Sequence, residues 1–199
     1  MGDIDRQAPK IAEDYAALTP DTLLDAVESC GYLSDGRFLA LNSYENRVYQ
    51  IGIEDSEPLI AKFYRPSRWS NAAILEEHAF AQELADSEIP VVAPLTREGV
   101  TLHTYSGYRF ALYPRQGGHW PELNSREDRE WIGRFIARIH AVGTTRNFRH
   151  RPVLDVDSFG YRPSRYLLES GFIPAHIENA YETLAEDLLE RVAATFDTL

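Results

Sequence analysis

The chain has 199 residues and a net charge of −11, so it has the size of one domain or of part of a larger one. Its 31 acidic residues outnumber 20 basic ones, which argues against a general nucleic-acid binder, because such a protein needs a basic face to neutralise phosphates. The single cysteine, Cys30, excludes an internal disulfide and a cysteine-based zinc site.

Nothing in the sequence indicates a membrane partner. No apolar run approaches the about 18 residues that a membrane-spanning helix needs, and residues 1–10 lack the apolar segment of a secretory signal. We therefore expect a cytoplasmic protein. Residues 1–18 are polar with scattered apolar side chains, and we expect this N-terminus to be poorly ordered.

A helix is predicted after this segment, because Thr19 is a typical N-cap and Pro20 a typical first helical residue. Strands are then expected over Phe38–Leu41, Arg47–Ile51 and Leu59–Phe63, where β-branched, aromatic and aliphatic residues dominate. The polar residues between the first two of these strands read as a loop.

The pattern of the third strand is typical of a nucleotide site. It carries one lysine, Lys62, among apolar neighbours. A loop between antiparallel strands, followed by a strand with one lysine, is the arrangement with which kinases hold ATP. On the pattern alone, a lysine on the solvent face of the strand is an equally good interpretation.

A helix over Asn71–Asp86, capped by Ser70, follows the lysine strand. Two further strands, Thr101–Tyr105 and Tyr108–Tyr113, meet at Ser106-Gly107, which is a hairpin signal. Up to this point the sequence predicts a five-stranded antiparallel sheet with one inserted helix.

The remainder of the chain has helical patterns. Ser125 and the acidic residue three positions later predict a helix start. A short helix is expected at Ser164–Leu168, and a last amphipathic helix has its apolar residues spaced over Ile177–Phe196. The change in pattern predicts an N-terminal lobe over residues 19–116 and a partial helical lobe over residues 117–199.

Several strings in the right order carry a resemblance: LNSYENRVYQ, AKFYRPSRW, ILEEHAFAQELADSEIPVVAPL, FALYPRQGG and IGRFIARIHAVG. Together they closely resemble the bacterial stress response kinases, which belong to the aminoglycoside-phosphotransferase-like group of kinases. The resemblance covers the chain from about Leu18 to its end. It implies an α+β, protein-kinase-like fold, with the five-stranded sheet as N-terminal lobe and the first helices of a helical C-terminal lobe.

The resemblance also implies an activity, namely ATP- and Mg-dependent transfer of phosphate to Ser or Thr of a protein substrate during a stress response. In this reading Lys62 contacts ATP and pairs with Glu77 on the next helix. The alternative for Glu77 is a solvated helix carboxylate.

Five other residues are implied to touch the nucleotide. Asn42, Ser43 and Tyr44 stand where a glycine-rich loop would cover the phosphates, although a purely structural turn remains an alternative. Tyr113 and Arg115 would offer connector backbone N–H groups to adenine, because Pro114 between them lacks an N–H.

The family's catalytic loop, a His-Gly-Asp segment followed by an Asn, does not occur in these 199 residues. We therefore expect the N-terminal portion of a kinase, which holds nucleotide without turning it over and has no catalytic or metal-binding residue of its own. The parent protein, meaning the longer kinase, is expected to be monomeric. The alternatives are a small-molecule phosphotransferase of the aminoglycoside, choline or homoserine kinase type, which shares the fold, and a non-catalytic nucleotide-binding or interaction module.

Overall fold

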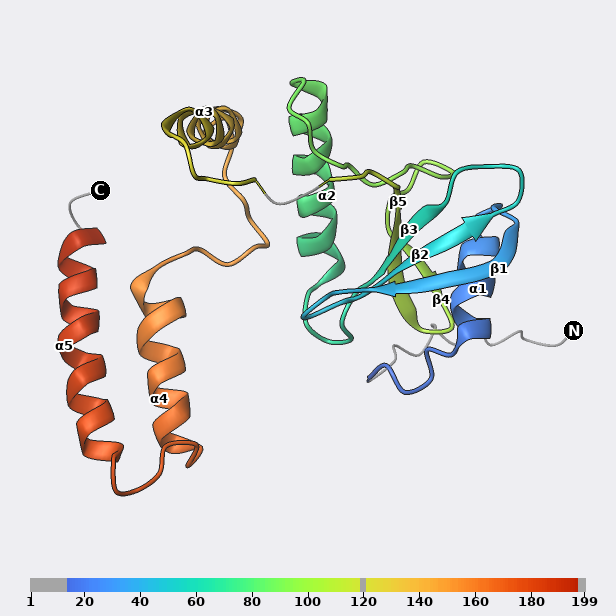
Figure 1. The fold of residues 1–199 in the computed structure, drawn as a ribbon. Helices are drawn as coiled ribbons and strands as arrows, with labels where there is room; N and C mark the ends of the chain where they lie inside the picture. The colour runs from blue at the N-terminus through green and yellow to red at the C-terminus, as the bar shows by residue number, and fades with distance from the viewer. Residues whose placement is uncertain (1–13, 119–120, 197–199) are drawn as a thin grey trace, which may run out of the picture. The chain divides into compact units, whose positions relative to one another are not determined.

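The computed structural model describes residues 14–118 and 121–196 (Figure 1). The elements are α1 (Pro20–Glu28), β1 (Ser34–Leu41), β2 (Arg47–Ile53), β3 (Leu59–Phe63), α2 (Asn71–Asp86), β4 (His103–Tyr105), β5 (Tyr108–Pro114), α3 (Arg126–Gly143), a π-helical turn (Asp157–Tyr161), α4 (Arg162–Glu169) and α5 (Glu178–Phe196). The chain divides after His150 into two compact units. The predicted lobe boundary at residue 117 stays a prediction.

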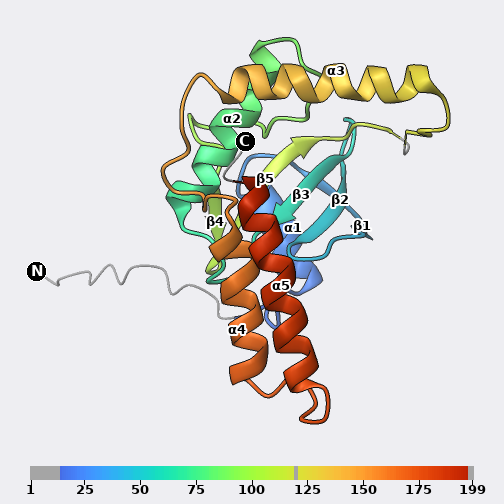
Figure 2. The same cartoon turned by 90° about the vertical axis from the view of Figure 1, so that its left-hand side faces the viewer.

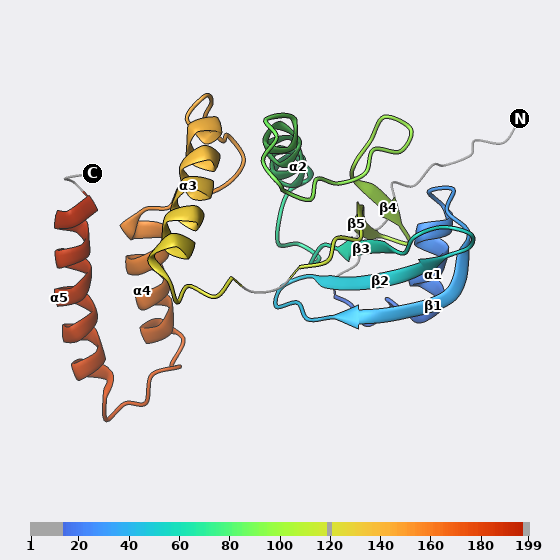
Figure 3. The same cartoon turned by 45° about the horizontal axis from the view of Figure 1, so that its top comes forward.

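The sheet of the first unit is antiparallel throughout, with the strand order β1-β2-β3-β5-β4 (Figure 3). This confirms the predicted five-stranded sheet. β3 lies at its centre, so Lys62 stands opposite Val48 of β2 and Ala111 of β5. β1 begins at Ser34, earlier than predicted, with a shift of register before Phe38.

The alternation of side chains along β3 gives the sheet two different faces. Ala61 and Phe63 are fully buried in a cluster that includes Val27 of α1. Phe63 stacks on Phe110 of β5, with ring centroids 5.2 Å apart. Lys62 projects from the opposite face. One face is therefore the apolar core of the unit, and the other is available for polar chemistry.

Helix α2 begins as the sequence predicts, because the Ser70 hydroxyl accepts the N–H of Ala73 at 3.1 Å. Ile74 is fully buried in a second cluster with Tyr64 and Ala111. Since Ala111 is the β5 partner of Lys62, this cluster seats α2 beside the face from which Lys62 projects.

The hairpin between β4 and β5 turns at Ser106 and Gly107, whose φ angles are 47° and 82°. Positive φ at both central residues suits the twist of a two-residue hairpin, and Gly107 adopts it without a steric penalty. The hairpin predicted from this dipeptide is confirmed.

Residues directly before α1 pack against the core. The Tyr15 ring stacks on Tyr108 at a centroid distance of 6.5 Å, and Leu18 also contacts the core cluster. This packing differs from the poorly ordered N-terminus expected over residues 1–18, because two apolar side chains among polar ones gave too weak a pattern to show it. Residues 1–13 lie outside the described residues.

Helix α3 begins with a full capping box, in which Ser125 and Asp128 each accept the other's backbone N–H. Near its C-terminal end, the Arg138 guanidinium donates to the carbonyls of Ser87 and Glu88 at 3.2 and 3.0 Å. Helix α3 is thereby joined to the end of α2 within the first unit.

The second unit is a helical pair, in which α4 and α5 run antiparallel side by side (Figure 2). The short helix predicted at Ser164–Leu168 extends over Arg162–Glu169 and continues from the π-helical turn. Leu184 and Leu188 of α5 are 59% and 51% exposed, so part of its apolar face is uncovered. Within the part of the chain that the structure describes, no helix combines the length and apolar character needed to cross a bilayer.

The stacked pair in the core gives a test of the fold. Phe110→Ala should lower the free energy of unfolding of the first unit by about 3–5 kcal/mol, because it leaves a cavity against Phe63. Urea denaturation followed by circular dichroism measures this value. Tyr44→Ala, at a fully exposed position (102%), is the control and should change stability by about 0.5 kcal/mol or less. Similar losses in the two variants would contradict the proposed core.

Candidate functional site

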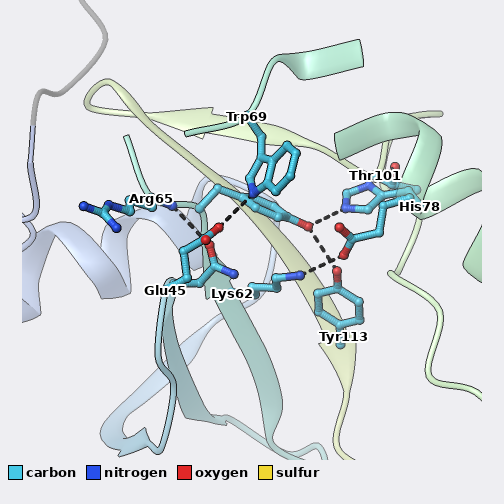
Figure 4. Close-up of polar contacts among 10 residues, drawn as sticks. Glu45, Lys62, Arg65, Trp69, His78, Thr101 and Tyr113 are labelled. Atoms are coloured by element: carbon cyan, nitrogen blue, oxygen red, sulfur yellow. Dashed lines mark hydrogen bonds and ion pairs between the residues drawn. The ribbon is translucent and has the colours of Figure 1, made fainter. Parts of the chain in front are cut away.

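An ion pair joins the central strand to helix α2. Lys62 Nζ lies 2.9 Å from Glu77 Oε1, and the two side chains are 23% and 34% exposed (Figure 4). The predicted Lys62–Glu77 pair is thus confirmed. The Lys62 ammonium also lies 4.7 Å from the centroid of the Tyr64 ring, a cation–π distance. An ammonium has three N–H donors, so the bond to Glu77 leaves donors that an anionic ligand can use.

The neighbouring Glu76 bonds to a different segment, the loop after α3. Its carboxylate accepts the backbone N–H groups of Arg149 at 2.6 Å and His150 at 2.9 Å. Glu83, two turns further along α2, pairs with Arg146 of the same segment. Successive residues on a helix are about 100° apart, which explains why Glu76 and Glu77 serve different partners.

A cavity of about 370 Å³ lies beside the ion pair. It is lined by residues of β2, β3, α2, β5, the segment before β4 and the connector after β5: Val48, Ile60, Lys62, Glu77, His78, Ala81, Val92, Pro94, Tyr113, Pro114 and Gln116. Apolar walls with a few placed polar groups are typical of small-molecule sites.

The pairing of β3 with its neighbouring strands shows which part of the site lies at each end of β3. Leu59, at the start of β3, stands opposite Pro114, the last residue of β5 before the connector. Phe63, at its end, stands opposite Arg47, which directly follows the Asn42–Asn46 turn. The connector and the turn are therefore at opposite ends of β3, and Lys62 is close to the turn.

The Asn42–Asn46 turn does not line the cavity. The Ser43 hydroxyl donates to the Asn46 carbonyl at 2.8 Å, so it closes the turn, as the structural interpretation expected. Asn42 is exposed and Tyr44 is fully exposed. Contact of these three residues with nucleotide stays a prediction.

The contact of adenine with the backbone N–H groups of Tyr113 and Arg115 stays a prediction. Tyr113 lines the cavity, whereas Arg115 does not. The Arg115 guanidinium instead donates to the Gln50 side chain of β2 at 3.0 Å. Gln116, which the sequence interpretation did not include, lines the cavity instead. Strand alternation does not extend into an irregular connector, so no local pattern pointed to Gln116.

A network of hydrogen bonds holds Tyr64, the residue whose ring lies beside the Lys62 ammonium. His78, only 3% exposed, bonds through Nε2 to the Tyr64 hydroxyl at 2.6 Å and through Nδ1 to the Thr101 hydroxyl at 2.8 Å (Figure 4). The Tyr64 hydroxyl lies 3.2 Å from that of Tyr113. Burial lowers the pKa of His78 to about 4 and raises the pKa of Tyr113 to about 12, so both side chains are neutral at pH 7.

The sequence interpretation assigned no role to His78. A signal was available, because His78 is four residues after the buried Ile74 and therefore on the same face of α2. Its two hydroxyl partners, Tyr64 and Thr101, come from other segments of the chain, and only the folded structure identifies them.

Metal ligands are not grouped in the described part of the chain. Among residues 14–118 and 121–196, no three or more His, Cys, Asp or Glu side chains are arranged to hold a metal ion. The residues present thus do not fit a protein cage for Mg²⁺, which requires oxygen ligands in octahedral geometry.

Comparison with known proteins identifies the family. The model of the phosphotransferase enzyme family matches residues 37–198. The chain belongs to the phosphotransferase enzyme family. Stress response kinase A of Escherichia coli (strain K12) is 37% identical over 180 residues, which are 90% of this chain and 55% of the relative. Serine/threonine protein kinase RdoA of Salmonella typhimurium is 38% identical over 184 residues, or 92% of this chain and 56% of the relative.

The chain therefore spans about half the length of the curated relatives it matches. Among solved structures, amicoumacin kinase hAmiN in complex with AMP-PNP, Ca²⁺ and Ami has a TM-score of 0.55 at 18% identity. The match covers 84% of this chain and 53% of that one. This likeness, together with the family match, confirms the protein-kinase-like α+β fold predicted from the sequence.

The buried His78 predicts a pH dependence of stability. Its pKa is about 4 when folded and 6.5 when unfolded, so the unfolded chain binds more protons between these values. Stability should be complete above pH 6.5 and should fall by about 3 kcal/mol toward pH 4 on account of this group. Urea denaturation of the unaltered chain and of His78→Gln over this range isolates its contribution. Parallel profiles for the two proteins would contradict the neutral buried histidine.

Proposed function

We propose that this chain is the nucleotide-holding N-terminal portion of an ATP-dependent serine/threonine protein kinase of the stress-response type. One observation carries the proposal, namely the Lys62–Glu77 ion pair at the wall of an apolar cavity that ends at the connector. A lysine fixed by a helical glutamate is the arrangement that places the α- and β-phosphates of ATP in kinases.

The register of β3 gives the orientation of the nucleotide in this proposal. Adenine lies at the connector end, between the side chains of Val48, Ile60 and Tyr113, where apolar surface excludes water from the base. Because Pro114 lacks an N–H, the donors to adenine come from the backbone of Tyr113, Arg115 or Gln116.

The phosphates lie toward the other end of β3 in the same proposal. Lys62 neutralises charge on the α- and β-phosphates, while backbone N–H groups of Asn42, Ser43 and Tyr44 cover them. Bound Mg²⁺ would neutralise charge on the phosphates; among the described residues, no cluster of His, Cys, Asp and Glu is arranged to hold the ion.

The acceptor is proposed for the parent protein, because the chain spans about half the length of its relatives. The name of the Salmonella relative, a serine/threonine protein kinase, supports a Ser or Thr acceptor on a protein substrate. The fold is shared with a small-molecule kinase, so a small hydroxyl compound is the competing acceptor.

Nucleotide affinity tests the site. Lys62→Met should weaken binding of ATP with Mg²⁺ by about tenfold or more, because it removes a charge-assisted contact to phosphate. Isothermal titration calorimetry of the 199-residue chain measures the affinity. Arg37→Met is the control, because Arg37 is exposed on β1, pairs with Asp35 of the same strand and does not line the cavity; this variant should bind as the unaltered chain does. Equal affinities for Lys62→Met and the control would contradict the assignment.

Phosphate transfer tests the acceptor. With labelled ATP, Mg²⁺ and a generic protein acceptor, we expect transfer by the full-length parent and none by the 199-residue chain, because these residues contain no His-Gly-Asp segment. A panel of aminoglycoside, choline and homoserine runs in parallel. Transfer by the parent only to one of these compounds would favour the small-molecule kinase, and comparable transfer by the 199-residue chain would show that a residue already present is catalytic.

A further inference from the structure

The Asn42–Asn46 turn is held by a contact that the proposed nucleotide site does not use. The Glu45 carboxylate accepts a hydrogen bond from the Trp69 indole at 2.8 Å (Figure 4). It accepts a second one from Arg68 Nε at 3.1 Å. The Arg68 guanidinium lies 4.7 Å from the centroid of the Trp69 ring, so the two donors also pack on each other. We call these three side chains the Glu45 clasp.

The clasp is an ionised, partly buried contact. The Glu45 side chain is 28% exposed. Burial acts to raise its pKa, but the hydrogen bonds from Trp69 and Arg68, together with the positive charges of Arg68 and Arg65, outweigh burial and lower the pKa. Hydrogen bonds to a charged acceptor are stronger than those between neutral groups.

Two further contacts fix the same turn. The Asn46 amide oxygen accepts the backbone N–H of Arg65 at 3.2 Å, and the Tyr15 hydroxyl lies 3.3 Å from the Glu45 carbonyl. The turn is thus joined to the segment between β3 and α2 at two places, and to the residues before α1 at a third.

The segment that holds the turn is itself anchored. The Trp69 carbonyl accepts a bond from the Arg109 guanidinium of β5 at 2.6 Å. Trp69 directly precedes Ser70, the N-cap of α2, and α2 carries Glu77. The clasp therefore links the turn to the helix that positions Lys62.

We propose that Glu45 is a positioning residue. It holds the Asn42–Asn46 turn, before nucleotide binds, in the place where the turn covers the phosphates of the bound nucleotide. The inference rests on the proposed function, since it assigns the turn to the phosphate end of that site. A turn that is already ordered does not lose conformational freedom on binding, so affinity for phosphate-bearing ligands is higher. Because the turn is remote from the connector, adenosine alone gains nothing from the clasp.

Affinities for adenosine, ADP and ATP with Mg²⁺ test this role in the 199-residue chain. Glu45→Ala should weaken ATP binding by about tenfold and leave adenosine binding within about twofold of the unaltered chain. Trp69→Phe, which removes the indole N–H but keeps an aromatic ring and the Arg68–Glu45 pair, should weaken ATP binding in the same selective way but to a smaller extent. Glu45→Gln keeps an oxygen for Trp69 and should recover most of the ATP affinity, although it removes a negative charge as Glu45→Ala does.

The double variant Glu45→Ala/Trp69→Phe should lose no more ATP affinity than Glu45→Ala alone, because Glu45→Ala already removes the contact with Trp69. Circular dichroism and thermal denaturation confirm folding, and if Trp69→Phe fails to fold, the Glu45→Ala and Glu45→Gln pair decides. Equal losses of adenosine and ATP affinity, or no loss in Glu45→Ala, would overturn the inference and leave the nucleotide site standing. Absence of ATP binding by the unaltered chain would overturn the proposed function, and the inference with it.

Discussion

The positive charge of Lys62 is the constraint on which the site depends. The lysine lies on the central strand, between neighbours from β2 and β5, so its counter-charge has to come from another element. A partly buried ammonium without a partner is unfavourable. Helix α2 supplies Glu77, and the buried Ile74 sets the rotation of α2 that directs Glu77 toward the sheet. The same ion pair therefore joins α2 to the central strand and forms part of the wall of the cavity.

Two polar assemblies support this pair. In the first, His78 bonds to Tyr64 and Thr101 in a buried network that reaches Tyr113 at the wall of the cavity. In the second, the Glu45 clasp joins the β1–β2 turn to the segment directly before α2. Both assemblies hold α2 beside the sheet and thereby support the geometry of the ion pair.

Much of the fold could be predicted from the sequence, because its signals are local. β3 and α2 have the predicted bounds, and the caps at Ser70 and Ser125 follow from residues within one helical turn. The Lys62–Glu77 pair was predicted through the family resemblance. Contacts between distant segments were not predicted, such as those of His78 with Thr101 and of Glu45 with Trp69, because they depend on the relative placement of whole elements.

A double-mutant cycle across Lys62 and Glu77, read out as ATP affinity, tests the central claim most directly. If Glu77 acts only by positioning Lys62, then Lys62→Ala, Glu77→Ala and the double variant should lose the same affinity, with a coupling free energy of about 1 kcal/mol or more. Additive losses, or full ATP affinity in Glu77→Ala, would contradict the account, because they would mean that the ion pair seen in the structure does not position the lysine for nucleotide.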